Sequence, residues 1–114
     1  MSNVIEEVDR FGAFEISCDR DEERYVVALA GELDIAGVDR VTRDILRAEA
    51  TDVSEVVLDL SRLTFIDSSG VAVILAADAR SRADGNRLRL IGGSAPVQRV
   101  FEVSGLLDRL PFID

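Results

Sequence analysis

Short apolar runs of strand length alternate with segments of helical periodicity over most of this 114-residue sequence. Three runs combine aliphatic or β-branched residues with flanking turn residues, which is typical of buried strands. They are "YVVALAG" (25–31), "EVVLDL" (55–60) and "RLRLIG" (87–92). Between the first two, four apolar residues fall on one helical stripe: Val38, Val41, Ile45 and Ala48. Because successive strand–helix–strand units form right-handed crossovers with parallel strands, this alternation predicts an α/β fold.

The ends of the sequence add two edge elements to this prediction. After an acidic start that we interpret as frayed, "FGAFEIS" predicts a first short strand that ends near Cys18. The charged turn 19–24 then joins it to the strand at 25–31 as an antiparallel hairpin. At the other end, "LLDRLPFID" predicts an edge strand, where Pro111 is tolerated.

The helices are predicted from their stripes and from their first and last residues. The first covers residues 38–50, and the second runs from Ser68 or Ser69 to Asp84, with Gly85 as a left-handed terminator. Ser94 is expected to cap a third helix that Gly105 ends. The strand at 55–60 is almost continuously apolar, so we expect both of its faces to be covered. Core positions are expected at Leu58, Ile74 and Phe101, and Phe65 and Phe112 are also expected in the core. The lone Cys18 is expected to be a packed or half-exposed small side chain without a redox role.

Composition excludes several function classes. The net charge of −9 repels phosphate backbones and anionic lipid, so neither nucleic acid nor a membrane surface is an expected partner. The arginines at positions 80, 82, 87, 89 and 99 form no continuous stripe, and we interpret them as a solvated face. No apolar run is long enough to span a bilayer, and the first residues do not resemble a secretory signal. We therefore expect a cytoplasmic protein.

Histidine is absent from the sequence, and there is one cysteine. A Ser-His-Asp arrangement and the usual zinc ligand sets are thereby excluded, so we expect no metal, no cofactor and no catalytic activity. Carboxylates alone can support glycosidase or magnesium chemistry, which leaves a small carboxylate-dependent enzyme as a disfavoured alternative.

The stretch "IDSSG" (66–70) places a carboxylate, two hydroxyls and a glycine where a strand hands over to a helix. One interpretation is purely structural: Asp67 or Ser68 caps the helix, and Gly70 permits close packing in its first turn. The other is functional, because the carboxyl ends of strands in open α/β sheets are where partners and ligands bind. Ser69 has the same chemistry as Ser68, so residue type alone leaves both hydroxyls as candidates.

Three segments in this order and spacing resemble the anti-sigma factor antagonists of the STAS domain family. They are "GELD" (31–34), "VVLDLSRLTFIDSSGVAVIL" (56–75) and "RLRLIGGSAPVQRVFEVSGL" (87–106). The resemblance covers residues 12–113 and implies one STAS domain over residues 1–114. Its fold is a mixed, mostly parallel β-sheet with an antiparallel edge hairpin and crossover helices.

The resemblance also implies a function and a site. Unmodified antagonists bind an anti-sigma factor and release its sigma factor. Many of these anti-sigma factors are serine kinases that phosphorylate the first serine of D-S-S-G, here Ser68, and a phosphatase reverses the modification. Asp34, Asp67, Ser69 and Gly70 are then expected to contact the partner together with Ser68.

The sequence is compatible with two alternatives to these expectations. Asp34 has a second interpretation, as a cap for the first helix. A non-switching STAS scaffold or ligand-binding subunit of a signalling or transport complex is the alternative function. A phosphate on Ser68 would lie near a helix N-terminus, which tolerates anions, so we expect a switch through charge and bulk with little change of fold.

Overall fold

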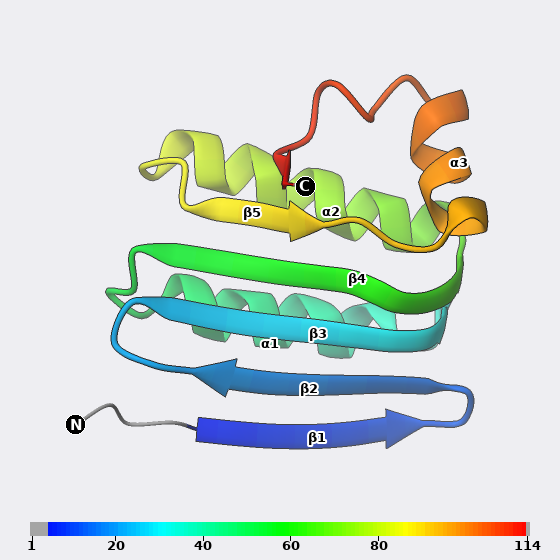
Figure 1. Ribbon diagram of the computed structural model, residues 1–114. Helices are drawn as coiled ribbons and strands as arrows, with labels where there is room; N and C mark the ends of the chain where they lie inside the picture. Colours follow the sequence, from blue (N-terminus) through cyan, green and yellow to red (C-terminus); the bar gives the residue numbers. More distant parts are fainter. Residues whose placement is uncertain (1–4, 114) are drawn as a thin grey trace.

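The computed structural model describes residues 5–113 of the chain. Six strands and three helices follow one another in the order β-β-β-α-β-α-β-α-β (Figure 1). The strands are β1 (Ile5–Phe11), β2 (Phe14–Arg20), β3 (Arg24–Leu33), β4 (Glu55–Ile66), β5 (Leu88–Ile91) and β6 (Phe112–Ile113). The helices are α1 (Val38–Glu49), α2 (Ser68–Ala83) and α3 (Ala95–Val103).

The six strands form one sheet in sequence order, with β3 and β4 at its centre. β1, β2 and β3 pair antiparallel, and β3 to β6 pair parallel. The predicted α/β fold with a mixed sheet is therefore confirmed. The antiparallel part is larger than predicted, because β1 precedes the expected hairpin and forms the edge of the sheet instead of a frayed start.

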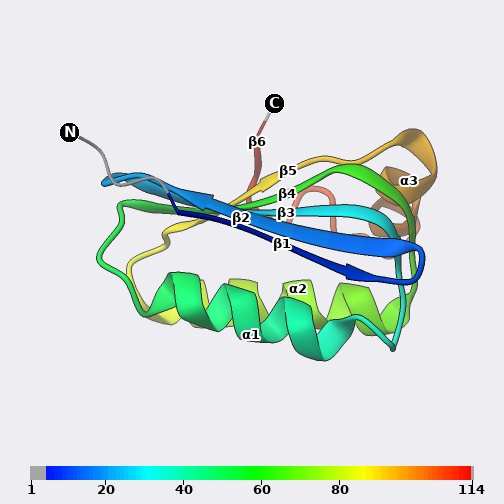
Figure 2. The ribbon, with the colours of Figure 1, turned by 90° about the horizontal axis from the view of Figure 1, so that it is seen from below.

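Helices α1 and α2 lie side by side on one face of the sheet (Figure 2). The burial of β3 alternates accordingly, with Tyr25, Val27 and Leu29 buried on the helix side and the residues between them half-buried. Both faces of β4 are covered over residues 56–58, as expected, because Val56, Val57 and Leu58 are all buried. Val57 alternates with the core residues Val56 and Leu58, and its register neighbours are Val26 and Arg89.

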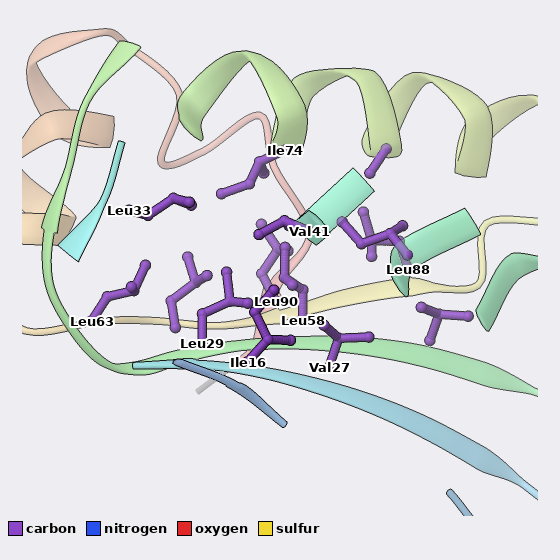
Figure 3. Packing of buried hydrophobic residues seen from close by; sticks show 14 of the residues in the cluster. Ile16, Val27, Leu29, Leu33, Val41, Leu58, Leu63, Ile74, Leu88 and Leu90 are labelled. Carbon is purple, nitrogen blue, oxygen red and sulfur yellow. The ribbon is translucent and has the colours of Figure 1, made fainter. Parts of the chain in front are cut away.

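The core fills the space between the sheet and its two long helices (Figure 3). Leu58, Ile74 and Phe101 are fully buried, as predicted, and Cys18 is packed rather than half-exposed. Phe112 is half-buried with its ring edge-on to Phe101 at a centroid distance of 5.3 Å. Phe65 does not belong to the core, since 47% of it is exposed.

The exposure of Phe65 follows from two irregularities in the pairing of β3 with β4. The register shifts between Ala28 and Ala30 and again between Gly31 and Glu32, each time with one extra residue on β4. Such bulges break the strict alternation of a strand. Leu63 and Ile66 are consequently buried while Phe65 faces solvent.

The arginines of the C-terminal half are not simply a solvated face. The Arg87 guanidinium donates to the carbonyl oxygens of Glu49, Thr51 and Val53 at 2.8–2.9 Å. Arg80 binds the Glu49 carboxylate at 2.9 Å. These contacts tie the C-terminal end of α1 to α2 and to the start of β5, so they are structural.

Candidate functional site

The D-S-S-G stretch lies where β4 passes into α2, at the end of the sheet that also carries the end of β3 and the nearby helix α3 (Figure 1). Leu33 and Ile66 are register partners, and the Asp67 backbone N–H donates to the Leu33 carbonyl at 3.2 Å. Asp34 and Asp67 therefore leave their parallel strands next to one another. Their proximity was expected, and the strand register provides it.

Asp67 is the N-cap of α2. Its Oδ1 accepts from the backbone N–H groups of Ser69 at 3.0 Å and Gly70 at 3.2 Å, which satisfies two donors that the helix start leaves unpaired. The Ser69 hydroxyl donates to the same oxygen at 2.5 Å. This hydroxyl, and then the two backbone donors, hold the pKa of Asp67 below its usual range. Asp67 is thus a carboxylate at neutral pH.

The two serines differ in what their hydroxyls do. Ser69 is half-buried and its hydroxyl is engaged by Asp67. Ser68 is exposed, and within residues 5–113 its hydroxyl takes part in no hydrogen bond. The expected accessibility of Ser68 is confirmed, and the geometry separates two side chains that residue type could not.

Asp34 is exposed just past the end of β3. Its Oδ1 accepts from the Ala36 backbone N–H at 3.0 Å, which closes a local turn. The N-cap of α1 is Gly37, with no side-chain capping bond. The interpretation of Asp34 as the cap of the first helix is therefore wrong, and its carboxylate lies at the surface beside the Asp67 turn.

Gly70 sets how closely α2 approaches the sheet. A β-carbon at this position would lie 2.7 Å from Cγ1 of Ile66 and 3.0 Å from Cδ2 of Leu33. Both side chains are buried, so a larger residue would push the start of α2 away from the strands. The expected close packing in the first turn is confirmed.

A groove of about 220 Å³ opens between α2 and α3 beside Ser68. This groove was not predicted from the sequence, although the run Val71–Leu75, which lines part of it, is apolar at every position. In the structure Ala72 and Leu75 are exposed, with 39% of Leu75 accessible. The available signal was the run itself: a helix that is apolar on every side and packs against one sheet face must leave part of that surface uncovered.

Two kinds of feature are absent from the part of the chain that the structure describes. Over residues 5–113, no three or more cysteine or carboxylate side chains gather closely enough to hold a metal ion. The same stretch contains no helix with the length and apolar content that crossing a bilayer requires.

Comparison with known sequences relates this chain to STAS domains and to anti-sigma factor antagonists. The family model described as "Mlab, STAS domain" matches residues 16–112. An anti-sigma F factor antagonist of Paenibacillus polymyxa is 33% identical over 90 residues, 78% of this chain and 77% of that protein. One from Lysinibacillus sphaericus is 35% identical over 86 residues, 74% of this chain and 73% of that protein.

Comparison with solved structures agrees in fold. The anti-sigma factor antagonist SpoIIAA in its unphosphorylated form superimposes with a TM-score of 0.63 and 25% identity, covering 96% of this chain and 89% of the other. An anti-sigma factor antagonist from Mycobacterium paratuberculosis has a TM-score of 0.69 at 19% identity, over 96% and 85% of the two chains. The second likeness concerns the fold alone.

Proposed function

The chain belongs to the STAS domain family, and from this premise we propose that it is an anti-sigma factor antagonist switched by phosphorylation of Ser68. In its unmodified form it binds an anti-sigma factor and so releases the sigma factor. The anti-sigma factor, or a kinase of that type, brings ATP and Mg²⁺ and modifies Ser68. A separate phosphatase restores the binding form. The whole cycle takes place in the cytoplasm.

The observation that carries the proposal is that the Ser68 hydroxyl is exposed and unbonded within residues 5–113, whereas the Ser69 hydroxyl is hydrogen-bonded to Asp67. A phosphoryl acceptor must reach the γ-phosphate and a catalytic base with its oxygen free, which the exposed Ser68 side chain offers. The Ser69 hydroxyl is committed to Asp67 and half-buried. Modification of Ser69 would remove a hydrogen bond at the helix start, whereas modification of Ser68 removes none.

The same geometry supports a switch without refolding. Phosphorylation adds about −1.5 to −2 charges at pH 7. The backbone donors of Ser69 and Gly70 already bind the Asp67 carboxylate, so the phosphate is expected to stay on the solvent side of Ser68. There it places charge and bulk next to Asp67 and near Asp34, at a surface to which the half-buried Ser69 contributes. Gly70 is buried, so the structure does not support the expected contact of Gly70 with the partner. We expect the partner surface to fit a hydroxyl and to carry negative charge from carboxylates and from the phosphates of bound ATP. The phosphate on Ser68 would then be repelled by these like charges.

The test of this function is site-resolved phosphorylation. Wild type, Ser68→Ala and Ser69→Ala are incubated with Mg²⁺-ATP and each purified anti-sigma-type serine kinase of the source organism. Intact mass and peptide mapping are then recorded. We expect one phosphoryl group on wild type and on Ser69→Ala, and none on Ser68→Ala. Modification of Ser68→Ala to the wild-type extent, or no modification of wild type by any of these kinases, would overturn the proposal.

A further inference from the structure

The groove between α2 and α3 has apolar walls and contains the proposed phosphoryl acceptor at its surface. Helix α2 contributes Ser68, Val71, Ala72 and Leu75, α3 contributes Val100, and Ser104 follows as the C-cap of α3. Ile66 and Asp67, at the end of β4 and just before α2, complete the lining. Val71 and Val100 are half-buried against the core, so they form a fixed base rather than a mobile rim. The groove is therefore a preformed apolar recess beside a surface hydroxyl.

Exposed apolar side chains also occur around this end of the molecule. Ile35 follows β3 and is 72% exposed, Phe65 lies near the end of β4, and Val103 closes α3 with 70% exposed. These elements meet at the same end of the sheet as the start of α2 (Figure 1). A partner that covers this end of the molecule would therefore meet further exposed apolar side chains besides those of the groove.

We infer that this groove receives a large apolar side chain of the anti-sigma factor, as part of the surface that covers Ser68. The inference rests on the proposed function and names a contact that the D-S-S-G motif does not contain. A specific interface covers about 800 Å² of each partner, a patch roughly 30 Å across. Because Ser68 itself lines the groove, a partner that reaches the Ser68 hydroxyl over such an area also lies over the groove.

The lining decides which kind of side chain enters. The polar groups of the lining are the Asp67 carboxylate and the hydroxyls of Ser68 and Ser104, and the remaining lining side chains are apolar. A polar or charged group that is buried among Val71, Ala72, Leu75 and Val100 would lose its hydration without compensation, because these side chains have no hydrogen-bonding atoms. An aliphatic or aromatic group gains from leaving water at the same place. Anchors of this kind, seated in a pocket near the centre of an interface, dominate binding energies. The groove therefore supplies affinity, while Ser68 supplies the switch.

The experiment fills the groove without adding charge. Ala72→Leu extends an exposed groove residue into the recess and suits a helix, so the fold is expected to be retained. Ala79→Leu is the matched control: it is exposed on the same helix, seven residues further along on the same side, and outside the groove. Dissociation constants are measured for wild type and both variants with the purified anti-sigma kinase that binds wild type, after thermal melts confirm folding.

We expect Ala72→Leu to weaken binding at least tenfold and Ala79→Leu to stay within twofold of wild type. Unchanged or tighter binding by Ala72→Leu, or an equal loss in both variants, would overturn the inference and leave the proposed function standing. No binding by wild type to any such kinase would instead remove the proposed function. Sedimentation of wild type alone adds one check: a dimer that Ala72→Leu disperses would assign the groove to a second copy and also overturn the inference.

Discussion

At the start of α2, Asp67 and Ser69 have a structural role, and the neighbouring Ser68 has the proposed regulatory role. The Asp67 carboxylate accepts from two backbone N–H groups and from the Ser69 hydroxyl. The side chains of Asp67 and Ser69 therefore both belong to the helix cap. Ser68 points to solvent and contributes nothing to that network. A cap that is complete without Ser68 leaves this hydroxyl available for chemistry that does not disturb the helix.

Replacing Asp67 tests the cap through its pH dependence. Asp67→Ala is expected to lower the free energy of unfolding by about 1 kcal/mol at pH 7. The folded pKa of Asp67 is depressed, so its contribution is present above the unfolded pKa and is lost as pH falls through the folded value. The difference between wild type and variant, measured by urea unfolding, should narrow below about pH 4.

Asp67→Asn serves as the control for this prediction, because asparagine caps helices about as well as aspartate without the titrating charge. It should lose less stability than Asp67→Ala at pH 7. A gap between wild type and Asp67→Ala of the same size at pH 7 and pH 3 would show that the carboxylate charge plays no part in the cap.

At the scale of elements, strands and helices with a clear period were predictable, and those whose pattern is set by their neighbours were not. β1 has the sequence "IEEVDRF". Its charged residues suit a strand at the edge of a sheet, but they also hide the apolar alternation by which a strand is distinguished from a loop. Phe65 lies on a strand, yet two bulges in the pairing with β3 turn it outward. Bulges depend on the partner strand, so the alternation of β4 alone could not reveal them.

The candidate site shows the same division. The cap at Asp67, the exposure of Ser68 and the close approach at Gly70 were predictable, because each follows from local chemistry at a strand–helix junction. The groove beside Ser68 was not, because it depends on where α3 lies against α2. The distinction between Ser68 and Ser69 also required the side-chain geometry.

Arg87 gives a test of how the helices are attached. Its guanidinium donates to three carbonyl oxygens at and beyond the end of α1, and its side chain is largely buried. Arg87→Met keeps the apolar stem and removes the donors, so we expect a loss of about 2–3 kcal/mol of unfolding free energy. Arg99→Met, on an exposed position of α3, should change stability by less than about 0.5 kcal/mol. Equal effects of the two substitutions in chemical denaturation would contradict the structural role of Arg87.

The whole molecule is a sheet with one face packed against two long helices and with its proposed binding region at one end (Figures 1 and 2). Stability resides in the layer between sheet and helices, where Leu58 on β4 is fully buried (Figure 3). The D-S-S-G turn and the groove lie at the end of this layer. Modification there can change the surface while the core stays as it is.

Leu58→Ala tests this view of the core. The cavity it leaves should cost about 2–5 kcal/mol of unfolding free energy in urea or guanidinium titrations. Phe65→Ala, on the same strand but half-exposed, should cost about 1 kcal/mol or less. A larger loss of unfolding free energy for Phe65→Ala than for Leu58→Ala would contradict the assignment of Leu58 to the core.

The most direct test of the proposed switch is the affinity of the anti-sigma factor for two forms of this chain, unmodified and phosphorylated at Ser68. Ser68→Ala is measured beside them, since it lacks the acceptor oxygen and adds no charge. We predict that unmodified protein and Ser68→Ala bind within a few-fold of one another. The phosphorylated form, with an unchanged melting temperature, should bind at least tenfold more weakly, because like charges brought together at an interface cost several kcal/mol. Equal affinity of the phosphorylated and unmodified forms would contradict the account and leave the two serines as parts of a helix start.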